Sequence, residues 1–69
     1  GSRATATLIA ADEVAVERFL AGSLSFPGMA GILESSVERF GAGEDQAPDF
    51  AALVALDAEV RAFCRTAQA

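Results

Sequence analysis

The sequence predicts an all-α fold, a small bundle of three to four helices. Three observations support this prediction. The 69-residue chain is 52% hydrophobic, and much of that share is alanine, the strongest helix former. Its apolar residues recur with the period of an α-helix, and no segment shows the alternation of a β-strand. A chain of this length is expected to form one domain around a single small core.

The first helix is expected over about residues 5–21. Because successive residues are about 100° apart on a helix, the large apolar side chains fall on one side, which we assign to the core. Thr5 or Thr7 is expected to cap the start, and Gly22 supplies the left-handed residue at the end. The core side is predicted to carry Leu8, Ile9, Ala15, Val16, Phe19 and Leu20, and the outer side Ala10, Val14, Glu17 and Arg18.

Three neighbouring residues of this helix are candidate structural or interdomain contacts. Asp12 falls near the middle of the apolar stripe, where an unpaired charge costs on the order of several kcal/mol. We expect Asp12 to accept hydrogen bonds from the start of another helix, with a contact to another domain as the alternative. Glu13 follows it but points about 100° away, so the pair does not face a common substrate. Val14 is expected to lie on the outer side, and an apolar side chain exposed there is typical of a surface that binds a partner.

A short connection leads to the second helix. Ser25 is its predicted N-cap, Pro27 fits only in a first turn, and Gly41 and Gly43 are expected to end it. The predicted core side comprises Phe26, Met29, Ala30, Leu33, Val37 and Phe40, while Pro27, Gly28 and Gly31 leave part of the outer surface bare.

A polar, acidic loop is predicted next, followed by one or two helices. Glu44, Asp45 and Asp49 lack the alternating ligand spacing of a calcium-binding loop, so we expect a solvated connection. Asp49 is the predicted cap of a helix that begins at Phe50. Asp57 is expected to cap a separate last helix, because aspartate is poor inside a helix; a mid-helix position is the alternative. The core side is predicted to carry Phe50, Leu53, Val54 and Leu56, then Val60, Phe63, Cys64 and Ala67.

Charge and composition exclude several classes of function. The net charge of −5 argues against binding to nucleic acid or to anionic lipid, and no apolar run is long enough to span a membrane. The single cysteine, Cys64, forms no internal disulfide and is expected to be a buried hydrophobe in a cytoplasmic protein. The chain contains no histidine, lysine, tyrosine or tryptophan. We therefore expect no catalytic, cofactor-binding or metal-binding residue in this chain.

Two motifs nevertheless resemble a known family. Residues 10–22, Ala-Ala-Asp-Glu-Val-Ala-Val-Glu-Arg-Phe-Leu-Ala-Gly, resemble the Asn-Ala-Ala-Asn-Glu-Val-Ala-Val-Glu-Ala-Phe-Leu motif that opens the C-terminal helical domain of 1-deoxy-D-xylulose 5-phosphate reductoisomerase. The resemblance continues through residues 24–26 and at residues 52–61, similar to the family's late Val-Leu-Ala-Val-Asp-Ala-Glu-Ala-Arg. Ile9 and Asp12 replace the first motif's two asparagines, and Pro27 and Gly28 stand where the family often has Thr-Asp.

The resemblance implies a role in a larger enzyme. That enzyme, a homodimer, converts 1-deoxy-D-xylulose 5-phosphate to 2-C-methyl-D-erythritol 4-phosphate in the non-mevalonate isoprenoid pathway, using NADPH and Mg²⁺ or Mn²⁺. Residues 3–69 then form one non-catalytic helical domain that supports the preceding catalytic and NADPH-binding domains, and residues 1–2 are expected to be a tag remnant. The alternative is a free-standing helical adaptor or a homodimerising interaction domain.

Overall fold

The computed structural model describes residues 2–42 and 49–68. The elements in these ranges are α1 (Ser2–Leu20), α2 (Phe26–Ser36), a π-helical turn η1 (Val37–Gly41) and α3 (Phe50–Thr66). The described residues contain no strand, so the all-α prediction is confirmed, with three α-helices in those ranges.

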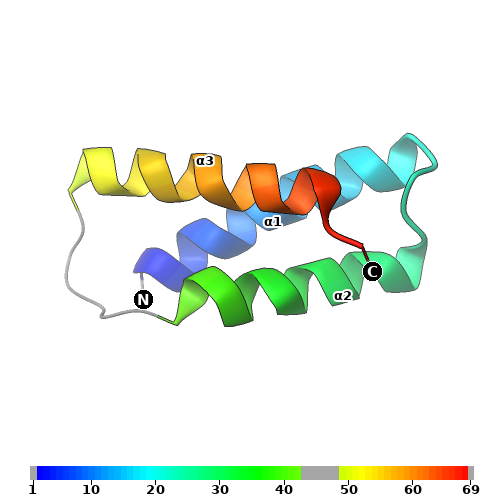
Figure 1. Ribbon diagram of the computed structural model, residues 1–69, viewed down its shortest axis with the longest axis horizontal. Helices are drawn as coiled ribbons and strands as arrows, with labels where there is room; N and C mark the ends of the chain where they lie inside the picture. The colour runs from blue at the N-terminus through cyan, green and yellow to red at the C-terminus, as the bar shows by residue number, and fades with distance from the viewer. Residues whose placement is uncertain (1, 43–48, 69) are drawn as a thin grey trace.

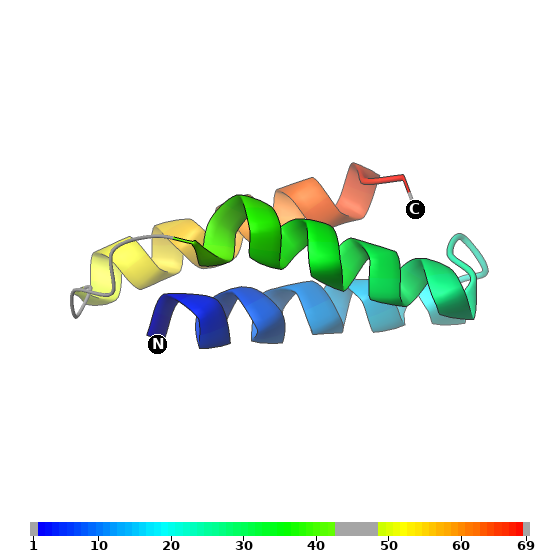
Figure 2. The ribbon, with the colours of Figure 1, turned by 90° about the horizontal axis from the view of Figure 1, so that it is seen from below.

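The bundle has two layers. In Figure 1, α2 and α3 lie side by side toward the viewer and α1 runs behind and between them. Figure 2 shows the same arrangement from below, with α1 along one side of the molecule and the other two helices along the opposite side. α1 packs against both α2 and α3, which touch each other only lightly. One side of α1 therefore faces the bundle and the other side faces away from it.

Three helix ends follow the predicted local signals. The Oγ atom of Ser25 accepts a hydrogen bond from the backbone N–H of Gly28 at 3.1 Å, with Pro27 in the first turn of α2. The carboxylate of Asp49 accepts one from the N–H of Ala52 at 2.7 Å. Gly22 has a φ of 80°, and the N–H groups around it bond back to the last turn of α1 as in a Schellman motif. These three caps are confirmed.

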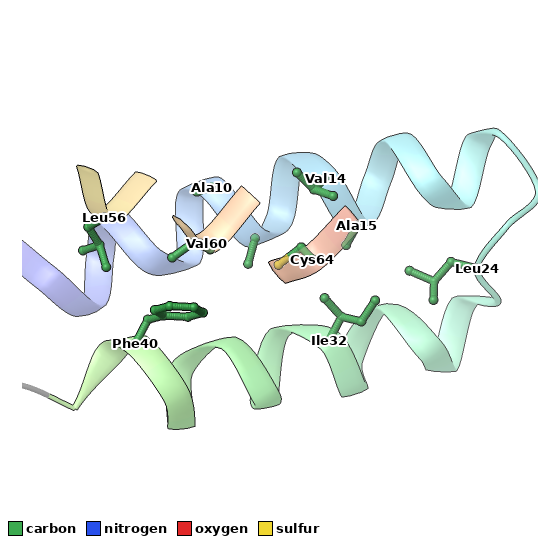
Figure 3. Close-up of a cluster of buried hydrophobic side chains, with 10 residues drawn as sticks. Ala10, Val14, Ala15, Leu24, Ile32, Phe40, Leu56, Val60 and Cys64 are labelled. Carbon is green, nitrogen blue, oxygen red and sulfur yellow. The ribbon is translucent and has the colours of Figure 1, made fainter. Parts of the chain in front are cut away.

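Buried side chains from all three helices form the core, shown in Figure 3. α1 contributes mainly alanines, which let the other helices approach its backbone closely. Cys64 is fully buried as predicted, with its Sγ atom 3.1 Å from the Oγ atom of Ser36. The core cluster comprises Ala10, Ala11, Val14, Ala15, Leu24, Ile32, Phe40, Leu56, Val60 and Cys64.

The predicted orientation of α1 is wrong. Ala10 and Val14, assigned to the outer side, are fully buried, whereas Val16 is 37% exposed and Leu20 78% exposed. The large residues of the predicted core stripe do share one side of α1, but that side faces away from the bundle, and within the stripe Ala15 alone is fully buried as predicted. Two helices pack against one side of α1, and that side is lined by small residues because large ones would hold the helices apart.

The start of α1 also differs from the prediction. The helix begins at Ser2, so neither Thr5 nor Thr7 is its cap. Thr7 is fully buried, and its hydroxyl donates a hydrogen bond to the carbonyl oxygen of Arg3 at 2.8 Å. This bond to the preceding turn satisfies the hydroxyl inside the core.

The second half of the chain carries further corrections. Asp57 lies inside α3, which is one continuous helix rather than two. Phe26 and Phe50 are 74% and 82% exposed, so these aromatic rings are not core residues. The predicted core residues Ala30 and Val54 are likewise exposed, and Gly28, predicted to lie on a bare surface, is buried.

The helical stretch that begins with α2 ends at Gly41, the last residue of η1, as predicted. A β-carbon on Gly41 would meet the side chain of Val37 at 3.3 Å and the backbone of Ala4 at 3.8 Å, so α1 passes close to this end. Gly43, Glu44 and Asp45 lie outside the described residues.

Candidate functional site

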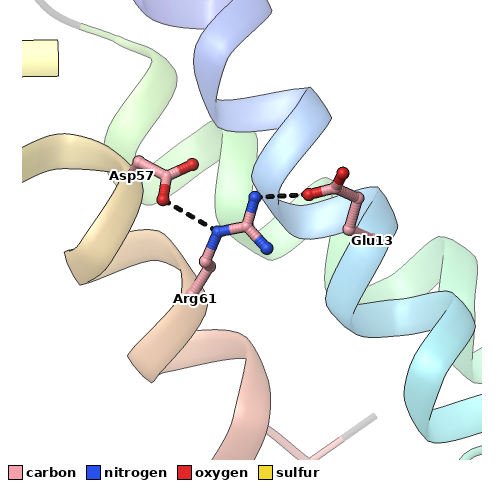
Figure 4. A network of polar contacts seen from close by, with 3 residues as sticks. All are labelled: Glu13, Asp57 and Arg61. Atoms are coloured by element: carbon pink, nitrogen blue, oxygen red, sulfur yellow. Dashed lines mark hydrogen bonds and ion pairs between the residues drawn. The ribbon is translucent and has the colours of Figure 1, made fainter. Parts of the chain in front are cut away.

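An arginine joins two of the four candidate residues. Figure 4 shows the guanidinium of Arg61, on α3, between Asp57 of the same helix and Glu13 of α1. Its Nε–H donates to Asp57 Oδ2 at 2.8 Å, and an NH2 hydrogen is donated to Glu13 Oε2. Both hydrogen bonds raise the pKa of Arg61 above its ordinary value, and the bond to Asp57 has the larger effect. The sequence analysis missed Arg61, although the spacing of four residues between Asp57 and Arg61 is typical of an ion pair inside a helix.

This network is a structural bridge at the surface. The side chains of Glu13, Asp57 and Arg61 are all partly exposed, and ion pairs at such positions contribute about 0–1 kcal/mol each. Both carboxylates are engaged by the guanidinium, which ties α1 to α3. The arrangement therefore explains why Asp57 lies inside a helix.

Asp12 and Val14 lie on opposite sides of α1. Asp12 is exposed, and it forms no hydrogen bond or salt bridge through its side chain with residues 2–42 or 49–68. The expectation that it is buried in the bundle as a structural acceptor is wrong. Val14 is fully buried and belongs to the core rather than to an outer surface.

We expect Asp12→Ala to leave the stability of the 69-residue chain unchanged within about 0.5 kcal/mol, because the substitution removes an exposed carboxylate without a partner in the bundle. Thermal unfolding followed by far-ultraviolet circular dichroism measures this. A clear drop in melting temperature would show that Asp12 stabilises the bundle itself.

The side of α1 that faces away from the bundle is rich in large apolar side chains. We call this side the outer face of α1, made up of Leu8, Ile9, Asp12, Val16, Phe19 and Leu20. Of the eight most exposed large hydrophobic residues among the described ones, five are on this face, so exposed apolar surface is concentrated on one helix. Scattered exposed hydrophobic residues need no explanation, but a concentrated patch marks an interaction site.

Two shallow depressions flank this face. One, between α1 and α3, is lined by Ala6, Ile9, Phe50, Leu53, Val54 and Asp57. The other, between α1 and the α2–η1 segment, is lined by Leu8, Leu33, Glu34, Val37 and Glu38. Both are mainly apolar, so they widen the apolar surface from α1 onto its neighbours.

Arg18, near the end of α1, forms hydrogen bonds to two neighbouring segments, the end of α3 and the connection between α1 and α2. Its NH1 group donates to the carbonyl oxygens of Cys64 at 2.9 Å and Ala67 at 2.6 Å, at the end of α3. Its Nε–H donates to the Oγ atom of Ser23 at 3.3 Å, in the connection to α2. Carbonyls in the last turn of a helix lack partners within that helix, and Arg18 supplies them from α1.

The acidic residues that the structure describes form no group able to hold a metal ion. Among the described residues, no three side chains of histidine, cysteine, aspartate or glutamate lie close enough together to hold one. In the same part of the chain, no helix is both long and apolar enough to cross a membrane.

The described residues thus form a small all-α bundle of three helices with an exposed apolar face on α1. Its sequence matches one known domain family. The family model described as the DXP reductoisomerase C-terminal domain matches residues 1–63, and the chain belongs to this family. No match is found among curated proteins or among solved structures.

Proposed function

We propose that this chain supports the catalytic part of a DXP reductoisomerase by packing against it, without contributing a catalytic group. Membership in the C-terminal domain family ties it to a larger reductoisomerase of isoprenoid biosynthesis. The single observation that carries the supporting role is the outer face of α1, where apolar side chains gather on the side that the bundle leaves uncovered.

We further propose that the enzyme's chemistry resides in its other domains. In this proposal the homodimeric enzyme binds NADPH and Mg²⁺ or Mn²⁺ there, and it rearranges and reduces 1-deoxy-D-xylulose 5-phosphate to 2-C-methyl-D-erythritol 4-phosphate. Glu13 and Asp57 are already engaged by Arg61, and the described carboxylates do not form a metal-binding group. The carboxylates in residues 2–42 and 49–68 therefore give no support for placing the metal ion in this domain.

Removal of residues 5–69 from the full-length reductoisomerase tests the supporting role. We expect the rate of NADPH oxidation, with 1-deoxy-D-xylulose 5-phosphate and Mg²⁺ supplied, to fall about 100-fold or more, because small displacements of catalytic groups have effects of that size. The truncated enzyme should still bind NADPH, which a fluorescence titration checks. Retained binding distinguishes lost support from global unfolding.

The full-length enzyme with Ser35→Ala is the control, because Ser35 is exposed on α2 and outside the outer face of α1. Its activity should match that of the unmodified enzyme. Full activity in the truncated enzyme would contradict the supporting role and leave the free-standing adaptor as the better hypothesis.

A further inference from the structure

We propose that the outer face of α1 docks onto another domain of the same reductoisomerase, at an apolar surface that presents an arginine or lysine side chain to Asp12. This inference rests on the proposed supporting role and adds to it the docking face and the chemistry of the partner surface.

The first argument is the distribution of apolar side chains around α1. The inward side carries the fully buried Ala10, Ala11, Val14 and Ala15. The outward side carries large residues such as Ile9, which is 56% exposed, and Leu20. A helix with apolar residues on two of its sides is typical of a helix that is covered on more than one side. The bundle covers only the inward side, which leaves the large apolar residues of the outer face for a second protein surface.

The second argument is the continuity of the surface. At one end of the outer face, Ile9 shares a depression with Phe50 and Val54 of α3. At the other end, the ring of Phe19 packs edge-on against that of Phe26 in α2, with centroids 6.1 Å apart. A partner surface that rests on α1 thus reaches both neighbouring helices and covers exposed aromatic rings at each end.

The third argument is charge. Asp12 stands among the apolar residues of the outer face, and Glu13 and Glu17 are exposed on the same helix. The two arginines of α1 are engaged elsewhere: Arg3 donates to the carbonyl oxygen of Phe40, and Arg18 donates to the end of α3. Covering Asp12 with an apolar surface leaves a buried charge, which is strongly unfavourable unless a cation pairs with it. A basic side chain on the partner surface supplies that cation.

The same charge argues against a second copy of this chain as the occupant. Two outer faces in contact would enclose Asp12 of each copy in an apolar interface, because the outer face carries no basic side chain. Each chain already carries a net charge of −5, so such a pairing is repulsive. A basic surface on another domain of the enzyme is complementary instead.

Cysteine labelling in the full-length reductoisomerase tests the docking face. Val16→Cys places a thiol on the outer face of α1, and Ser35→Cys places a control thiol on an exposed position of α2. We expect the thiol at position 16 to react with a maleimide about 100-fold more slowly than the one at position 35, because labelling requires the docked face to open. Equal rates would overturn the proposal.

Substitutions at Asp12 test the basic partner. In the Val16→Cys enzyme, Asp12→Lys should raise the labelling rate at position 16 at least about tenfold, and Asp12→Asn should raise it less, because only the lysine repels a cation. An unchanged rate with Asp12→Lys would refute the basic side chain. These rates report docking independently of turnover, so they remain informative if the truncated enzyme proves active and the supporting role fails.

Oxidation of the same variant separates the two possible occupants. If another domain covers α1, the thiols at position 16 of two subunits stay apart and no disulfide-linked dimer forms on mild oxidation. A slowly labelled thiol that readily forms such a dimer would show that a second copy covers the face, which would also overturn the proposal.

Discussion

Val14→Asn is expected to destabilise the 69-residue chain by about 3–5 kcal/mol, because it removes a fully buried apolar side chain and puts an amide without partners in its place. For a domain of this size, about 1 kcal/mol corresponds to a change of about 4–8 °C in melting temperature. The variant should therefore melt more than about 10 °C below the unmodified chain. Thermal and urea unfolding followed by circular dichroism measure the difference.

Val16→Asn is the matched control, since the same substitution is made two residues further along the same helix. Val16 lies on the outer face of α1, so its replacement should change the stability of the isolated chain by less than about 0.5 kcal/mol. If Val16→Asn proved the more damaging substitution, α1 would be oriented as its large apolar residues suggest, and the described packing would be wrong.

Arg18→Met is expected to destabilise the chain by about 2–3 kcal/mol, because hydrogen bonds from a charged donor each contribute about 1.5–3 kcal/mol and several are lost together. Methionine retains most of the aliphatic packing of the side chain but donates no hydrogen bonds. The carbonyl oxygens of Cys64 and Ala67 then lose their partner on α1. Urea unfolding gives the free energy, and amide exchange in the last turn of α3 should accelerate.

Arg65→Met controls for the loss of one positive charge near the same helix end. Arg65 is exposed in the last turn of α3, and no hydrogen bond from its side chain joins it to the described residues. We expect a change below about 0.5 kcal/mol. Equal effects at the two positions would mean that Arg18 acts through its charge rather than through its hydrogen bonds.

Three helix ends could be predicted from the sequence because they depend on local chemistry. Ser25 and Asp49 cap helices through backbone groups three residues away, and Gly22 adopts the left-handed conformation that other residues avoid. No knowledge of the rest of the fold is needed to read these signals. Asp57 was misread as a cap because the local rule was applied without its i,i+4 partner Arg61.

The orientation of α1 could not be predicted by the same reasoning. Periodicity shows which residues share one side of a helix. It does not show which side packs against the bundle when two sides of the helix are both apolar. Large side chains such as Leu20 suggested a core, whereas close packing of two neighbours required alanines at positions 10, 11 and 15. Because the side with large residues was assigned to the core, Val14 was predicted to be exposed and Asp12 to be buried, and both predictions are wrong.

The candidate site depended on contacts between residues far apart in the sequence. Glu13 and Arg61 are 48 residues apart, and Arg18 and Ala67 are 49 apart, so no local pattern connects them. Glu13 and Asp57 were both candidates, but their link through one guanidinium emerges only once α1 and α3 are side by side. The family motifs gave the class of domain without giving these contacts.

Apolar residues on both the inward and the outward side of α1 limit how this sequence can vary. The inward residues are fixed by the spacing between helices, and in the proposed assembly the outward residues are fixed by a second surface. Substitution tolerance should then be low around the whole of α1, while exposed positions such as Ser35 on α2 and Ala55 on α3 accept most polar residues. A redesign that aims to make the bundle stand alone would leave Ala11 and Val14 untouched and place polar side chains at Ile9, Val16 and Leu20.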